Sequence, residues 1–431
     1  MESLSIKNEI DAKYRPRITD ARLKKLLETF GGVEITGPKW CGKTWTAIKH
    51  SNSAESLTEE SAIERAKLDP GLALDGDSPR LIDEWQEVPG IWDATRNLID
   101  ARANRPGQFI LTGSTQPKDI SKIRHSGAGR FARLRMYPMT LSESIDGAGG
   151  VSFAGLFDQE FASARFSTSL ADVAAWCCRG GWPAALGKSD EGATEIANEY
   201  VHSITQVSAP RAGHNPNTAT NLLRSLALNT AQPVTDATLL RDMGAGNSVS
   251  LPTLKTYLDF FAGLFMTEDL PGYGLQLRDK GRVRVKPKRY FTDPSLASAI
   301  QGATPERLLR DTQTLGNLFE TLVLRDLRVF LTSISGVGNT IGYYRDNSGL
   351  ECDFVVQLAD GRWGVIEAKL SENTIDDQAV KRLNRVVRAI AGNQATRVGE
   401  PSFRAFVVGK SEVAYRRKDG ILVIPAATLS A

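Results

Sequence analysis

The stretch Gly37-Pro38-Lys39-Trp40-Cys41-Gly42-Lys43-Thr44 fits the phosphate-binding pattern Gly-x-x-x-x-Gly-Lys-[Ser/Thr]. The apolar residues 33–36 before it predict a short strand, and residues 45–50 after it predict the first turns of a helix. Gly37 and Gly42 let the backbone curl so that successive N–H groups face phosphate oxygens, and the N-terminus of the helix adds a partial positive charge. The alternative is a glycine-rich turn that fits the pattern by accident.

The motif of residues 37–44 predicts a binding site for ATP and Mg²⁺. Lys43 is expected to reach the β- and γ-phosphates, and Thr44 is expected to ligate the metal ion. The loop backbone makes most of the phosphate contacts in such sites. The predicted nucleotide-binding residues of this segment are Gly37, Pro38, Lys39, Trp40, Cys41, Gly42, Lys43, Thr44 and Trp45.

Two further segments place polar residues at the ends of predicted strands. Asp83 and Glu84 follow the apolar residues 81–82, and Thr112 and Ser114 end the run 108–114. In a nucleotide-hydrolysing sheet the first acid holds Mg²⁺ through water and the second orients the attacking water. Asp83 is therefore a predicted metal-binding residue, Glu84 a predicted catalytic residue, and Thr112 a predicted sensor of the γ-phosphate. Taken singly, each segment is more often a solvated strand end or a turn.

The order of these segments resembles AAA-type P-loop ATPases that carry a C-terminal domain of unknown function, DUF4143. Residues 37–44, 81–84 and 111–114 carry the resemblance, together with residues 127–131, 137–143 and 180–183. It extends from about residue 19 to about residue 370 and implies a parallel-sheet ATPase core. Cys41 and Trp85 depart from the family pattern, but neither is expected to disturb phosphate binding.

Composition agrees with a multidomain enzyme. A chain of 431 residues predicts about two to four domains, and 41% apolar residues suffice for buried cores. No apolar run approaches the roughly 18 residues of a membrane helix, and the polar N-terminus does not resemble a secretory signal. The four cysteines lack zinc spacing, which together with the absence of a signal predicts a cytoplasmic protein that does not interact with membranes. A net charge of +3 is too small to indicate nucleic-acid binding by itself.

The chain is predicted to be an α/β protein of four parts. They are a P-loop AAA-type ATPase core with a parallel sheet (residues 1–150), a helical lid and linker (151–215), a winged-helix-like domain (216–295) and a restriction-endonuclease-like DUF4143-type domain (296–431). Glycine-rich residues 146–155 mark the first boundary. Apolar residues at spacings of three and four between positions 168 and 207 predict the helices of the lid.

The third part has the order of a helix-turn-helix followed by a basic hairpin. Residues 222–227, 234–244 and 250–261 predict helices, with Pro252 suited to a first helical turn. Basic residues then alternate at Lys280, Arg282, Arg284, Lys286 and Lys288. One basic face on a hairpin suits contacts with DNA phosphates, so DNA is a candidate partner. Such modules also serve as protein-binding or lid domains, and that alternative is equally open.

The C-terminal part contains a predicted hairpin turning at residues 360–361. Asp353 lies on its first strand, Glu367 and Lys369 lie on one face of its second strand, and Glu320 lies on the preceding helix. This arrangement resembles the restriction-endonuclease-like nuclease core. The resemblance implies that Glu320, Asp353, Glu367 and Lys369 form a catalytic site and that Asp353 and Glu367 bind a metal ion.

Arg130 is the predicted arginine finger, acting on the γ-phosphate of a neighbouring subunit in a homo-oligomer. An exposed arginine beside a strand is an equally open interpretation. The sequence as a whole predicts an ATPase that couples nucleotide state to DNA binding or processing. The alternative is a regulatory or scaffolding ATPase whose nuclease-like domain is inactive.

Overall fold

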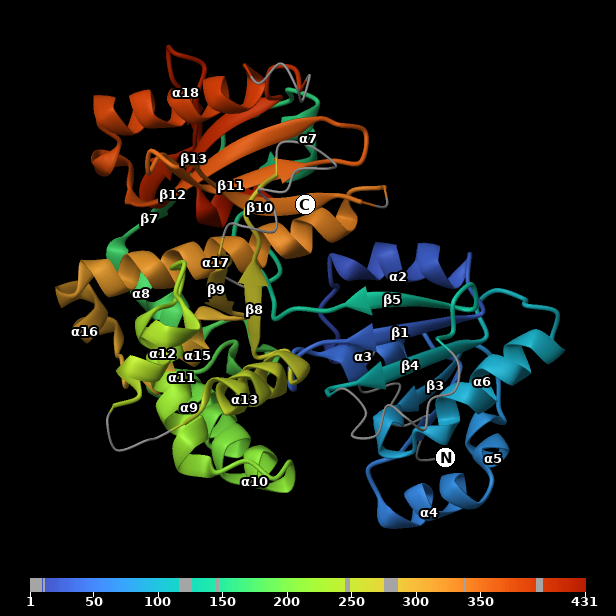
Figure 1. The fold of residues 1–431 in the computed structure, drawn as a ribbon. Coiled ribbons are helices and arrows are strands. Elements are labelled where there is room, and N and C mark those ends of the chain that lie inside the picture. The colour runs from blue at the N-terminus through green and yellow to red at the C-terminus, as the bar shows by residue number, and fades with distance from the viewer. Residues whose placement is uncertain are drawn as a thin grey trace. The chain divides into compact units, whose positions relative to one another are not determined.

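The computed structural model describes residues 10, 12–115, 126–144, 147–244, 249–274, 286–336, 338–392 and 398–431. Its contacts divide the chain into two compact units. The first unit comprises Met1–Pro138 and Gly263–Phe265, and the second comprises Met139–Ala262 and Met266–Ala431. Figure 1 labels most of their helices and strands.

The described residues of the first unit form a parallel sheet of five strands in the order β2-β3-β4-β1-β5. The strands are β1 (Gly32–Thr36), β2 (Ser53–Ser56), β3 (Arg80–Asp83), β4 (Phe109–Gly113) and β5 (Phe131–Arg135). The register pairs Thr36 with both Gly113 and Arg135, and it pairs Asp83 with Thr112. The carboxyl ends of the strands therefore share one edge of the sheet, as the sequence predicted.

Helices flank this sheet (Figure 1). They are α2 (Thr19–Leu27), α3 (Lys43–Lys49), α4 (Glu60–Leu68), α5 (Pro70–Leu74) and α6 (Gly90–Ala101). Trp92 of α6 stacks on Phe131 of β5 with ring centroids 4.3 Å apart, and Trp85 lies 5.1 Å from Trp92. Ile82 and Leu111 belong to the same buried cluster. This apolar packing fixes the strands whose ends carry Asp83 and Thr112.

The second unit begins with β6 (Val151–Ser152), α7 (Phe153–Phe157) and β7 (Arg165–Thr168). Helices α8 (Leu170–Arg179) and α9 (Asp190–His202) follow, and a π-helical turn at Ser203–Ser208 leads into α10 (Ala209–Arg211). Ser169 and Asp172 form a capping box that starts α8. These helices confirm the helical periodicity predicted for residues 168–207.

Three helices and a two-stranded antiparallel sheet come next. They are α11 (Pro216–Leu228), α12 (Asp236–Asp242), α13 (Leu251–Gly263), β8 (Thr267–Leu270) and β9 (Lys288–Phe291). The helices and the position of Pro252 agree with the sequence prediction, whereas a winged-helix domain stays a prediction. Lys280, Arg282 and Arg284 lie outside the described residues. Helices α15 (Pro294–Ile300) and α16 (Pro305–Arg310) complete this region.

The C-terminal part contains a mixed sheet in the order β10-β11-β12-β13-β15-β14, with β7 paired to β13. Its strands are β10 (Thr340–Arg345), β11 (Glu351–Gln357), β12 (Trp363–Ser371), β13 (Phe403–Val413), β14 (Tyr415–Arg416) and β15 (Leu422–Pro425), and β16 (Leu429–Ser430) pairs with β6. Strands β11 and β12 form the antiparallel hairpin that the sequence predicted. Helices α17 (Thr312–Ser333) and α18 (Asp377–Ala391) lie on opposite faces of this sheet in Figure 1.

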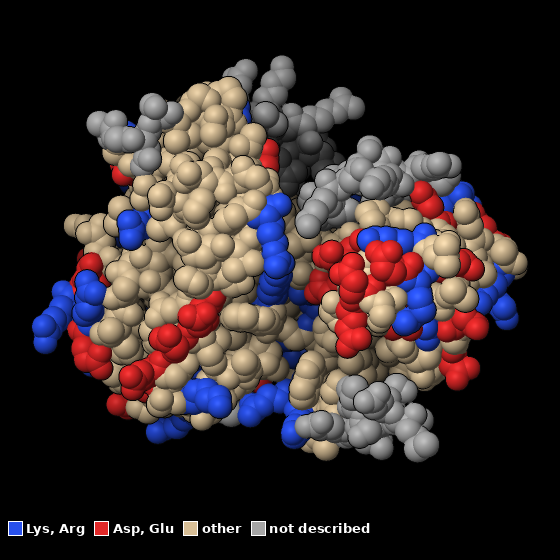
Figure 2. All heavy atoms as spheres, turned by 90° about the horizontal axis from the view of Figure 1, so that it is seen from below, with Lys and Arg blue, Asp and Glu red and all other residues tan. Residues whose placement is uncertain are grey.

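Charged side chains of both signs occur on the face drawn in Figure 2. On the face drawn in Figure 2, Lys and Arg side chains are scattered, and Asp and Glu side chains lie near many of them. Among the described residues of that face, no broad basic surface is visible. The mixture agrees with the small net charge of the chain.

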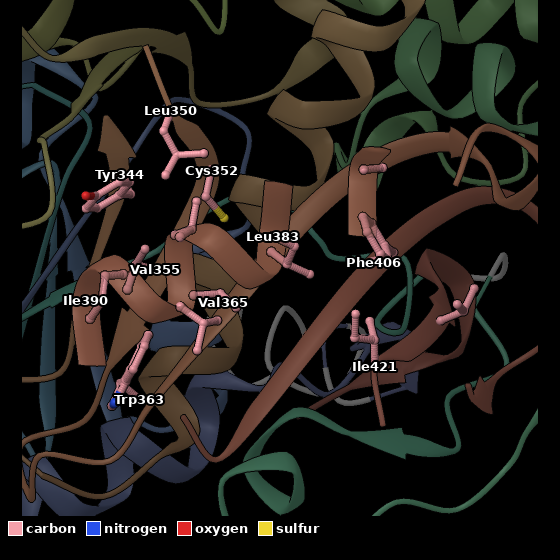
Figure 3. Close-up of a cluster of buried hydrophobic side chains, with 14 of the residues drawn as sticks. Tyr344, Leu350, Cys352, Val355, Trp363, Val365, Leu383, Ile390, Phe406 and Ile421 are labelled. Carbon is pink, nitrogen blue, oxygen red and sulfur yellow. The ribbon is translucent and has the colours of Figure 1, made fainter. Parts of the chain in front are cut away.

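Helix α18 supplies one side of a buried core in the C-terminal part (Figure 3). Leu383 and Ile390 of α18 pack with Val355 of β11, Val365 of β12 and Phe406 of β13. The packing fixes the hairpin of β11 and β12 from this face. Residues 353, 367 and 369 of that hairpin carry the predicted nuclease-like side chains.

A buried ion network joins distant segments of the second unit. Arg325 of α17 is 2% exposed and donates to Asp293 at 2.9 Å and to Asp326 at 2.8 Å. Asp326 also accepts from Leu141 N at 3.1 Å, and Asp293 accepts from Gly181 N at 3.0 Å. Residues 139–141 therefore pack in the second unit, although the sequence placed them in the ATPase core.

Candidate nucleotide-binding site and carboxylate cluster

The loop 37–42 connects β1 to α3 and requires its two glycines. Gly37 has a φ of 154°, and a Cβ atom there would lie 2.2 Å from the carbonyl oxygen of Met136. Gly42 has a φ of 102° immediately before α3. Both conformations are costly for other residues, so the backbone confirms the strand-loop-helix context that the motif needs.

Lys43 points into the loop. Its side chain is almost fully buried, and Nζ donates to the carbonyl oxygen of Pro38 at 2.8 Å. The ammonium is thus held over the loop whose N–H groups are predicted to bind phosphate. The indoles of Trp40 and Trp45 are about half exposed, and Cys41 is buried.

Asp83 collects hydrogen bonds from two predicted site residues. Thr44 Oγ1 donates to Asp83 Oδ1 at 3.0 Å, and Thr112 Oγ1 donates to the same oxygen. Burial raises the pKa of Asp83, and the hydrogen bonds from Thr112 and Thr44 oppose that rise. A hydroxyl and a carboxylate are hard oxygen ligands, so Thr44 and Asp83 fit a magnesium ion.

Glu84 follows Asp83 in a left-handed backbone conformation, with a φ of 55°. Such a conformation is uncommon outside glycine and clusters at functional sites. Ser114 Oγ donates to Glu84 Oε2 at 3.0 Å, and Gln86 Nε2 donates to the same oxygen. The glutamate is thereby oriented at the edge that also carries Asp83. Sequence reasoning missed Gln86, since its contact depends on the turn at Glu84.

Arg17 stabilises the loop through hydrogen bonds, and it was not identified from the sequence. It is 5% exposed, and it donates to Cys41 O at 2.8 Å and to Tyr137 O at 2.9 Å. The guanidinium thus ties the loop to the chain after β5. Its position two residues before α2 offers no local signal of this contact.

Arg130 lies at the opposite end of the sheet from the loop. Gly32 N donates to Arg130 O, so Arg130 stands beside the start of β1, whereas the loop follows its end. Its Nε donates to Asp100 at 2.7 Å, and its side chain is 38% exposed. Arg130 cannot reach the loop of its own subunit from this position. Its predicted action on a neighbouring subunit stays a prediction.

The four predicted nuclease-like residues lie together in the second unit. Lys369 Nζ is 3.0 Å from Glu367 Oε1. Asp353 Oδ2 accepts a hydrogen bond at 3.0 Å from the backbone N–H of Ala368, the residue between Glu367 and Lys369 in β12. Burial, together with the charge of Asp353, raises the pKa of both Glu320 and Glu367. The charge of Asp353 therefore acts on both glutamates.

Lys288 of β9 also enters this cluster. Its Nζ lies 3.0 Å from Glu320 Oε1, 2.8 Å from Glu351 Oε1 and 3.5 Å from Asp353 Oδ1. The sequence placed Lys288 on an exposed basic hairpin face, and that prediction was wrong because its side chain is 3% exposed. Burial alone would lower the pKa of Lys288, but the charges of Glu320, Asp353 and Glu351 outweigh it and raise the pKa.

The carboxylates of the cluster do not fit a metal ion in the arrangement found. Across the described ranges, no group of three His, Cys, Asp or Glu residues has a geometry that could hold a metal. Asp353 and Glu367 contact cations of the chain instead. Metal binding by these two residues stays a prediction.

Comparison with known proteins identifies two of the parts. Residues 31–145 match an AAA domain, and residues 315–429 match DUF4143, a domain of unknown function. The chain is therefore an AAA-type P-loop ATPase with a C-terminal DUF4143 region, as the resemblance implied. Residues 170–307 match DUF8612, another domain of unknown function, which extends across the predicted lid and winged helix.

Similarity to individual proteins is more distant. A solved structure, the Walker-type ATPase PABY2304 of Pyrococcus abyssi, is 12% identical with a TM-score of 0.42. The match covers 67% of this chain and 99% of that chain. No curated protein matches the chain. None of the helices in the described residues combines the length and apolar character that crossing a membrane requires.

Proposed function

We propose that the chain hydrolyses ATP at the loop 37–44 and uses the nucleotide state to control DNA binding by its second unit. The observation that supports the catalytic part is the convergence on Asp83, whose carboxylate accepts from Thr44 and Thr112 beside the oriented Glu84. Helix α3 and the ends of strands β3 and β4 thus supply groups that phosphoryl transfer requires.

The proposed reaction uses these groups in named roles. Loop N–H groups and Lys43 bind the phosphates, and Glu84 orients a water molecule toward the γ-phosphorus. The water oxygen bonds to phosphorus, the bond to the bridging oxygen of ADP breaks, and the proton of the water leaves to Glu84 or solvent. Thr44 and Asp83 would hold Mg²⁺, which neutralises charge on the phosphates. Thr112 and Ser114 connect the two acids to β4, so they are suited to report whether the γ-phosphate is bound.

Phosphate release tests this proposal. Glu84→Gln should bind ATP but hydrolyse it about 10²–10⁴-fold more slowly, because the water loses its base. Glu87→Gln, an exposed change three residues away, is the matched control and should hydrolyse ATP at the normal rate. Undiminished turnover in Glu84→Gln would refute the role given to Glu84.

The DNA part rests on the order of three helices followed by β8 and β9, and on the basic residues between these strands. Lys288 is no longer a candidate contact because it is buried in the second unit. Replacing Arg282 and Arg284 with glutamine should reduce the slope of log affinity against log salt by about 0.9 for each lost phosphate contact. An unchanged slope would exclude these two residues as the DNA contacts.

The second candidate is a regulatory ATPase whose nuclease-like domain does not cut. The pairing of Lys369 with Glu367 and of Lys288 with three other acids favours this alternative. Metal-dependent cleavage of plasmid or branched DNA separates the two. Cleavage that Glu367→Gln or Lys369→Ala abolishes would establish the nuclease, and the absence of cleavage in the ATP-hydrolysing wild type would support the regulatory ATPase.

A further inference from the structure

The carboxylate cluster of the second unit is built around an ammonium group of its own chain. Glu320 comes from α17, and Glu351 and Asp353 come from one face of β11, since they are two residues apart. All three have a carboxylate oxygen within 3.5 Å of Lys288 Nζ. A single cation thus contacts acids from two separate elements.

The position of Lys288 is fixed by its surroundings. Its Nζ lies 5.5 Å from the centre of the Tyr343 ring, and the Tyr343 hydroxyl donates to the carbonyl oxygen of Lys286. Tyr290, two residues along β9, donates from its hydroxyl to Glu320 Oε1 at 2.5 Å. The hairpin that carries Lys288 is therefore bonded to β10 and α17 on both sides of the lysine.

The chain before the hairpin loop reaches the same strand. Tyr273 N donates to Tyr343 O at 2.6 Å, and Tyr343 N donates to Pro271 O at 3.1 Å. Tyr343 of β10 thus holds residues 271–273 through its backbone and residue 286 through its hydroxyl. Both described ends of the segment 271–286 attach at the edge strand of the sheet.

Two further oxygens of the cluster also have partners. Asp353 Oδ2 accepts from Ala368 N, and Glu367 Oε1 is paired with Lys369. A divalent cation held by Glu320 and Asp353 would need the space between their oxygens that the ammonium occupies. The lysine and a divalent cation therefore exclude each other sterically and by like-charge repulsion.

We infer that the Lys288 ammonium takes the place of a divalent metal ion among the acids of the DUF4143 region. The acids that resemble a nuclease site anchor β9 instead, and the domain binds no divalent cation at Asp353 while Lys288 is in place. This inference goes beyond ATP hydrolysis and does not depend on it.

Manganese binding to the full-length chain without nucleotide tests the inference. The number of bound ions is measured by electron paramagnetic resonance for the wild type, Asp353→Asn, Lys288→Gln and the double variant. The wild type and Asp353→Asn should bind the same number of manganese ions. Any ion at the P-loop site is common to both chains and does not affect this comparison. Lys288→Gln should bind one more manganese ion than the wild type. The double variant should bind only as many ions as the wild type. Lys286→Gln removes an exposed charge two residues away and should gain none.

Two results would overturn the inference. The first is wild-type manganese binding that Asp353→Asn abolishes, which does not require Lys288→Gln to fold. The second is a folded Lys288→Gln variant that gains no ion, because Lys288 would then not be what excludes the metal. Either result is independent of whether the chain hydrolyses ATP.

Discussion

Thr44 Oγ1 donates to Asp83 Oδ1 at 3.0 Å, linking the start of α3 to the end of β3. The two residues are 39 positions apart in the sequence. Their contact supports one site made from the phosphate-binding loop and the acidic strand end.

Removing the Thr44 hydroxyl should weaken magnesium binding at the site, so that hydrolysis needs more Mg²⁺. In Thr44→Val, the Mg²⁺ concentration for half-maximal turnover should rise by about 10–100-fold, since even indirect partners of a metal contribute that much. ATP binding measured without Mg²⁺ should be unchanged. Thr58→Val, at an exposed threonine, is the control. An unchanged Mg²⁺ concentration for half-maximal turnover would show that Thr44 is not a metal ligand.

Arg130 should act between subunits if it acts on ATP at all. Its ion pair with Asp100 stands at the far end of β1 from the loop, so it cannot serve its own site. Arg130→Ala should slow hydrolysis by about 10³–10⁵-fold without weakening ATP binding. Mixing it with a Lys43→Ala chain, which keeps Arg130, should restore turnover. Arg133→Ala, an exposed change on β5, is the control. Full activity of Arg130→Ala alone would show that Arg130 has no role in hydrolysis beyond its surface ion pair with Asp100.

Arg325 should be essential for the stability of the second unit. Arg325→Met leaves Asp293 and Asp326 buried without their cation, which should cost about 3–5 kcal/mol of unfolding free energy. Arg310→Met, at an exposed position in α16, should change it by less than about 0.5 kcal/mol. Urea denaturation monitored by circular dichroism provides the comparison. A loss below about 1 kcal/mol in Arg325→Met would contradict this account of the network.

The cysteines should be unreactive in the folded chain. All four are buried, and burial raises the pKa of Cys178 to about 12 and raises the pKa of Cys177 and Cys352 as well. Because a raised thiol pKa disfavours the nucleophilic thiolate, a thiol-specific disulfide reagent at pH 8 should modify the native chain slowly and all four thiols after denaturation. The contribution of Cys178 to stability is retained below pH 9 and is lost as the pH rises from about 9 to 12. Rapid modification of the native chain would show that these sites open readily.

The strand, loop and helix of the motif and the shared edge of the strands could be predicted from the sequence, because simple local rules govern them. Gly37, Lys43 and Thr44 occupy one motif, and the rule for parallel strands places Asp83 and Thr112 at the same edge. The sequence did not reveal Arg17 and Gln86, whose contacts depend on loop conformations rather than on spacing. It also gave no sign that Lys288 would pair with Glu320 and Glu351, since alternating basic residues equally describe an exposed strand. Burial of that lysine follows only from the packing of β9 against α17 and β11.

ATP binding by the loop 37–44 should depend on Lys43. Isothermal titration of ATP into the wild type and Lys43→Ala measures this dependence, with Lys49→Ala as an exposed control on the same helix. Lys43→Ala should weaken binding at least about tenfold, because a charge-assisted hydrogen bond contributes about 1.5–3 kcal/mol. Lys49→Ala should bind as the wild type does. Equal ATP affinity in the wild type and Lys43→Ala would contradict the assignment of the site.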